Sequence, residues 1–118
     1  MSYDITFKVK VEGCDRWVPV GDCTANITWN VREIITRSTG LSWGNEENNG
    51  LCKDVIPFIE KGLHELRVNG VKYIKYESPN GWGTVGGTIR FFETIIKEWS
   101  YFEYTEPELA QVATFWIE

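Results

Sequence analysis

Three short stretches of the chain place a tryptophan beside asparagine and glycine residues, or beside asparagine alone. They are ITWN (residues 27–30), SWGN (residues 42–45) and NGWGT (residues 80–84). An indole face can stack on a flat ring, an amide side chain can pair with the ring's polar edge, and glycine allows close approach of the backbone. A helix beginning after such a stretch adds unpaired amide groups that can hold an anion or a carbonyl. The pattern favours binding of a nucleotide-like ring.

The predicted ligand-binding residues come from these stretches and from the helix expected after the first of them. They are Trp29, Asn30, Arg32, Trp43, Asn80, Gly81, Trp82, Gly83 and Thr84. Asn80-Gly81 predicts a tight turn, and Thr84 predicts a cap for the following helix. The alternative for Trp82 is a packed position that closes the core, because buried tryptophan is common. The alternative for Asn30 is a plain helix cap.

Catalysis has little support in the sequence. It contains no GxSxG elbow, HExxH pair, Walker loop or GxGxxG after a strand. His64 lies on a predicted helix beside Glu60 and Glu65, as a surface histidine would. Cys52, near a helix start, is expected to be a small buried side chain rather than an activated thiol. We therefore expect no enzyme activity, no metal and no cofactor.

Composition and charge narrow the class of protein. The chain has 118 residues, 42% of them hydrophobic and 25% charged, which predicts one domain over residues 1–118 with its own core. The net charge of −5, with acidic and basic residues interspersed, disfavours general nucleic-acid binding. Three cysteines without CxxC spacing predict reduced thiols and a location in the cytoplasm. The sequence shows neither a signal peptide nor an apolar run long enough to span a bilayer, so no membrane association is expected.

Strands are predicted near both ends of the chain. Residues 3–12 alternate between apolar and polar, which is typical of a half-buried strand. Residues 17–20 predict a second strand, and Pro19 favours an edge position because proline lacks an amide donor. Residues 22–28 form either a third short strand or an ordered loop. Residues 109–118, rich in β-branched and aromatic side chains, predict the last strand.

Helices are predicted in the middle of the chain. They cover residues 28–40, capped by Thr28 or Asn30 and ended by Gly40, residues 52–70 and residues 88–99. Residues 41–50 are expected to form a loop, and residues 71–78 an extended segment. The predicted fold is therefore α+β: a small, mostly antiparallel sheet formed by the N- and C-terminal strands and packed against about three central helices.

Several motifs occur in the same order as in a family of small phage and prophage proteins. Members of that family begin with a YDI or YDV strand, carry ITYN, and show NGWGT or GNA before a helix. This chain resembles them in YDI at residues 3–5, NITWN at 26–30 and NGWGT at 80–84. The resemblance extends to about Trp99. Trp29 replaces the usual tyrosine, and residues 40–50 are longer than the family's loop.

The resemblance implies a viral origin rather than a particular activity, and small phage proteins of this kind often counter host immunity. With the aromatic stretches, it leads us to expect a non-catalytic protein that sequesters a small nucleotide-like signalling molecule in the cytoplasm of a bacterial host. The alternative is an inhibitor that binds a host defence protein, as anti-CRISPR proteins do. A third class is a weak hydrolase of such a signal. Assembly into a homo-oligomer is left open.

A pocket lined by the predicted residues favours the first function, and a broad aromatic surface favours the second. A carboxylate or histidine directed into such a pocket would favour the hydrolase.

Overall fold

The computed structural model describes residues 2–43 and 47–118. A five-stranded antiparallel sheet has β1 (Ser2–Lys10) near its centre. On one side β1 pairs with β2 (Trp17–Val20) and, nearer the N-terminus, with β3 (Asn26–Thr28). On the other side it pairs with β5 (Thr114–Ile117), which in turn pairs with β4 (Glu47–Leu51). The terminal strands β1 and β5 are thus neighbours, as predicted.

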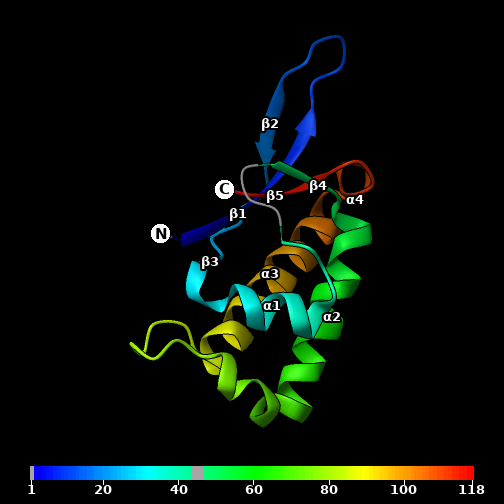
Figure 1. Cartoon of the computed structure of the whole chain (residues 1–118). Helices are drawn as coiled ribbons and strands as arrows, with labels where there is room; N and C mark the ends of the chain where they lie inside the picture. The colour runs from blue at the N-terminus through cyan, green and yellow to red at the C-terminus, as the bar shows by residue number, and fades with distance from the viewer. Residues whose placement is uncertain (1, 44–46) are drawn as a thin grey trace.

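The helices lie together beneath this sheet (Figure 1). The principal helices are α1 (Arg32–Thr39), α2 (Cys52–Asn69) and α3 (Val85–Thr105). Short 3₁₀ segments, η1 (Trp29–Val31) and η2 (Gly70–Tyr76), precede α1 and follow α2. A single turn, α4 (Pro107–Ala110), leads into β5. This arrangement confirms the predicted α+β fold.

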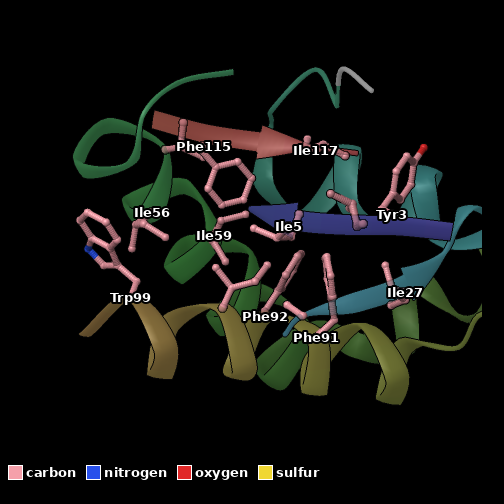
Figure 2. Close-up of a cluster of buried hydrophobic side chains, with 14 of the residues drawn as sticks. Tyr3, Ile5, Ile27, Ile56, Ile59, Phe91, Phe92, Trp99, Phe115 and Ile117 are labelled. Carbon is pink, nitrogen blue, oxygen red and sulfur yellow. The ribbon is translucent and has the colours of Figure 1, made fainter. Parts of the chain in front are cut away.

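The core lies between the sheet and α3. The alternation predicted for the first strand is present, since Tyr3, Ile5 and Phe7 are buried while Asp4 is exposed. Figure 2 shows aromatic and aliphatic side chains from both layers meeting in this space. They include Ile5, Phe115 and Ile117 from the sheet, Ile59 from α2, and Phe91, Phe92 and Trp99 from α3. Because both layers contribute large apolar surfaces, neither is expected to be stable without the other.

The predicted ends of the first helix are confirmed in detail. The Thr28 side chain accepts a hydrogen bond from the Asn30 amide at 3.4 Å, so Thr28 is the residue that caps η1. Gly40 ends α1 in the left-handed conformation with φ of 78°. A residue without a Cβ atom adopts that conformation at little cost.

Two segments differ from the sequence predictions. The extended segment predicted for residues 71–78 is wrong: η2 continues the chain from α2 as a tight 3₁₀ helix to Tyr76. The loop predicted for residues 41–50 contains β4, whose polar sequence carries no strand pattern. Its residues pair with β5, so tertiary context overrides local propensity. The final strand is also shorter than predicted, because residues 107–110 form α4.

Among the helices of the described residues, none combines the length and the apolar character needed to cross a bilayer.

Candidate functional site

Trp82 lies on the surface, on a turn that holds its backbone in place. The Asn80 side-chain oxygen accepts hydrogen bonds from the Trp82 amide at 2.9 Å and from the Ser78 hydroxyl at 2.7 Å. Gly81 and Gly83 flank it with φ of 79° and 93°, in the region that favours glycine. The Trp82 side chain is 69% exposed. The alternative in which Trp82 closes the core therefore does not hold.

Gly83 brings two of the predicted stretches together. A Cβ atom on Gly83 would lie 3.0 Å from both Asn30 Cβ and Val31 Cγ1. The backbone of the Trp82 turn thus packs directly against η1, where only glycine fits without displacement. The sequence placed residues 29–30 and 80–84 in one site, and they are neighbours in the fold.

Trp29 has a partly exposed ring whose polar group is already occupied. Its indole N–H donates to the Ser2 carbonyl at 2.9 Å, and its ring stacks on Tyr3 with 5.8 Å between the ring centres. Burial raises the pKa of the Tyr3 phenol, and the nearby positive charge of Arg32 partly opposes that rise. Arg32 itself is exposed. Trp29 therefore serves first to hold η1 on β1, with one ring face left near the surface.

Trp43 belongs to the core, whereas the sequence predicts that it contacts a ligand at the surface. It is 2% exposed and makes edge-to-face contacts with Tyr3, Phe91 and Phe115, at 5.9, 6.2 and 6.0 Å between ring centres. Its indole nitrogen has no hydrogen-bond partner in the part of the chain that the structure describes. Trp43 lines a hollow of about 30 Å³, which has room for a water molecule. The indoles of Trp43 and Trp82 therefore do not line one pocket.

The amide groups at the start of α3 are largely used by the chain itself. The Thr84 hydroxyl accepts from the Gly87 amide at 2.9 Å, which confirms the predicted cap. The Val85 amide donates to the Glu77 carboxylate at 2.7 Å. An anion at this helix end would have to displace Glu77 from the position that favours negative charge. The N-terminus of α3 is thus a poor candidate for an external phosphate.

The main clefts in the described residues lie away from the Trp82 turn. The clefts along α3 are lined from Gly87 onward, and further ones lie at the β1–β2 turn and beside Trp43. None of these has a wall formed by residues 29–32 or 80–84. Trp82 thus lies on an exposed turn outside these clefts.

Exposed aliphatic side chains follow one another from the end of α2 into η2, and Figure 1 shows η2 and the loop before α3 at the same end of the molecule. Val68, Val71 and Ile74 are 63%, 82% and 53% exposed and occur every third residue from the end of α2 into η2. Residues three apart share one side of a 3₁₀ helix. A Cβ atom on Gly70 would lie 3.3 Å from Val85 Cγ1, so η2 starts against the beginning of α3. We call Val68, Val71 and Ile74 the aliphatic ridge, and the ridge together with Trp82 the η2-end surface.

Sequence reasoning missed the aliphatic members of this surface. The sequence instead predicts that these residues belong to the end of an ordinary helix and to an extended segment after it. The signal was available in the three-residue spacing of Val68, Val71 and Ile74. That spacing identifies an exposed ridge only once the segment is known to be a 3₁₀ helix.

Two of the three cysteine thiols are at least partly buried. Burial raises the pKa of the Cys23 thiol to about 12, and burial also raises the pKa of Cys52. The expectation that Cys52 is a small buried side chain is confirmed. His64 is exposed on α2. No group of three or more His, Cys, Asp or Glu residues within residues 2–43 and 47–118 is placed to hold a metal ion.

Comparison of the chain with protein-family models, with curated proteins and with solved structures found no match.

Proposed function

We propose that this chain is a non-catalytic binding protein that docks on a partner protein through the η2-end surface. The observation that carries the proposal is Trp82, a side chain 69% exposed on a turn fixed by hydrogen bonds. Large apolar side chains exposed together on a small protein commonly mark an interaction site. Tryptophan is also enriched among residues that dominate binding energy.

The rigid backbone of the turn favours binding. Asn80 fixes the Trp82 amide, and Gly83 packs on η1, so little backbone freedom remains to be lost when a partner binds. Charged groups border the aliphatic ridge, since Lys72 and Lys75 alternate with Val71 and Ile74. An apolar centre with a charged border is the usual anatomy of a protein interface.

The resemblance to small phage proteins suggests the kind of partner. A host defence protein in the bacterial cytoplasm fits both the exposed apolar surface and the counter-defence role common among such proteins. A second copy of the chain is a further occupant that the same surface would accept.

Sequestration of a nucleotide-like signal is the second candidate function. It is favoured by the contact at Gly83, which places Asn30 beside the Trp82 turn, as a ring-binding site requires. It comes after the protein partner because none of the clefts described above is lined by residues 29–32 or 80–84.

Site-specific photocrosslinking in host cells tests the proposal. A photoreactive phenylalanine derivative at position 82 should capture one host protein. The same group at Tyr104, which is 86% exposed near the opposite end of α3, should not capture it. Crosslinking to the chain itself would identify a homo-oligomer. Equal capture from both positions, or capture from neither together with calorimetric binding of a cyclic nucleotide, would contradict the proposal.

A further inference from the structure

A cleft of about 520 Å³ lies between the β2–β3 connection and the C-terminal half of α3. Its walls include Asp22 from the connection, and Glu98, Tyr101, Phe102 and Glu106 from α3 and its C-cap. Pockets for small ligands commonly have volumes of about 300–1,000 Å³. The cleft lies along the C-terminal half of α3, whereas Trp82 precedes the N-terminus of α3, so the cleft is separate from the η2-end surface.

Two contacts hold the wall formed by the connection. Gly21, with φ of 70°, lies so close to α3 that a Cβ atom there would be 3.0 Å from the Phe102 ring. The Thr24 amide donates to both Glu98 carboxylate oxygens at 2.9 and 3.0 Å, and the Thr24 hydroxyl donates to one of them at 3.0 Å. The cleft is therefore formed before any ligand arrives, which lowers the cost of binding.

Two aromatic rings line the cleft. Phe102 is almost fully buried and Tyr101 is 68% exposed, and both line it. Such surfaces accept methylene groups, and the face of an aromatic ring attracts an ammonium ion. The preferred ligand therefore combines an aliphatic chain with positive charge.

The charged groups also favour a cation. Three carboxylates, from Asp22, Glu98 and Glu106, and one ammonium group, from Lys97, line the cleft, leaving two negative charges. Within the described residues, neither Asp22 nor Glu106 forms an ion pair.

The end of α3 adds to this negative potential. Its last turn contains no basic residue, although the carbonyl end of a helix carries partial negative charge that cations stabilise. Glu103 and the C-cap Glu106 lie there instead. A bound cation would reduce the repulsion between these carboxylates and the negative carbonyl end of the helix.

From this juxtaposition of aromatic rings and carboxylates we infer that the cleft binds a linear aliphatic polyamine. Glu98 and Glu106 are eight residues apart, which corresponds to about 12 Å along a helix axis. A single ammonium group cannot contact both. A chain with an ammonium group at each end, such as spermidine, can reach both while its methylene groups lie on Tyr101 and Phe102.

Calorimetric titration with spermidine and 1,8-diaminooctane tests the inference. Both should bind, and raising the salt concentration should weaken binding. Octylamine keeps the aliphatic chain but only one charge, and we expect it to bind roughly tenfold more weakly. 1,8-Octanediol has no charge and should not bind. Failure of both diamines to bind, or equal affinity for octylamine, would overturn the inference.

Charge-matched variants separate this site from general attraction to an acidic protein. Asp22→Asn with Glu106→Gln should weaken spermidine binding roughly tenfold. Asp54→Asn with Glu60→Gln removes the same charge from the exposed side of α2 and should change affinity by less than about twofold.

Tyr101→Ala should weaken binding, whereas Tyr104→Ala, outside the cleft, should not. Equal effects of the two double variants would overturn the proposal, as would binding of a lysine-rich peptide without binding of spermidine. Unchanged urea midpoints confirm that each variant is folded.

Discussion

Trp43 and Trp82 show how residues in similar sequence contexts take opposite roles. Each lies next to glycine and near asparagine, yet Trp43 is 2% exposed and Trp82 is 69% exposed. Trp43 packs on Phe115, whose strand is central to the sheet. Trp82 follows an Asn80 turn that directs it outward. Burial is decided by elements far away in the sequence, which local composition does not reveal.

Replacing Trp43 tests its assignment to the core. Trp43→Ala should lower the free energy of unfolding by about 3–5 kcal/mol, because it removes a buried ring and leaves a cavity. Trp43→Phe should cost clearly less, since the indole nitrogen has no partner among the described residues to lose. Urea unfolding measures both. A Trp43→Ala variant as stable as the wild type would show that the ring is not buried.

The two glycines around Trp82 form a matched pair for mutation. Gly81 and Gly83 both have positive φ, but only a Cβ atom on Gly83 would meet neighbouring atoms, at 3.0 Å from Asn30 and Val31. Gly81→Ala should cost about 1 kcal/mol through backbone strain alone. Gly83→Ala should cost more, because η1 must also move. Equal losses in urea unfolding would contradict the packing of the turn on η1.

Thiol reactivity tests the environments of the three cysteines. Cys14 is exposed, whereas Cys23 and Cys52 are partly and fully buried and have raised pKa values. Because burial raises the pKa of the Cys23 thiol to about 12, little of it is thiolate at pH 8, so Cys23 should react with a disulfide reagent far more slowly than the exposed Cys14. The denatured, unreduced protein should show three reactive thiols. Finding one would indicate a disulfide and contradict the predicted cytoplasmic location.

Among the elements, regular patterns were predictable and irregular ones were not. The alternation in β1 and the helical spacing in α2 and α3 identified these elements correctly. β4 has the sequence ENNGL, and only its pairing with β5 makes it a strand. The aromatic and β-branched residues of η2 favour strands, yet the segment is a 3₁₀ helix whose first residue, Gly70, lies against Val85 of α3.

The candidate site was predictable only in part. Asn80, Gly81 and Thr84 have recognisable turn and cap chemistry, and the structure confirms both. Glu77 could not be foreseen at the start of α3, because its carboxylate reaches the Val85 amide from a segment predicted to be extended. Because of that contact, the apparent anion site at the start of α3 is already occupied by a carboxylate of the chain itself.

Gly62 lies where α2 packs closely against both α1 and α3. A Cβ atom there would lie 2.5 Å from Thr39 Cγ2 on α1 and 3.0 Å from Phe92 Cε2 on α3. Alanine favours a helix by about 1 kcal/mol over glycine, but overpacking costs about 1–3 kcal/mol. We expect Gly62→Ala to be destabilising, whereas Lys61→Ala on the exposed side should stay within about 0.5 kcal/mol of the wild type. A stabilised Gly62→Ala variant would contradict the close packing of the helices.

At the scale of the whole molecule, the two candidate sites lie toward opposite ends of α3. The N-terminal end carries the η2-end surface, where both Trp82 and the aliphatic ridge are exposed. Toward the C-terminal end is the cleft with Asp22 and Glu106. This separation allows variants at one end to be tested without altering the other.

The affinity of a Trp82→Ala variant for the photocrosslinked partner tests the central claim most directly. Truncation of a dominant interface residue costs at least about 2 kcal/mol, so the dissociation constant should rise about thirtyfold or more. Because Trp82 is exposed, the free energy of unfolding should stay within about 0.5 kcal/mol of the wild-type value. Tyr104→Ala should change neither quantity. Unchanged affinity for the partner in the Trp82→Ala variant, or a loss of stability as large as that expected for Trp43→Ala, would contradict the account.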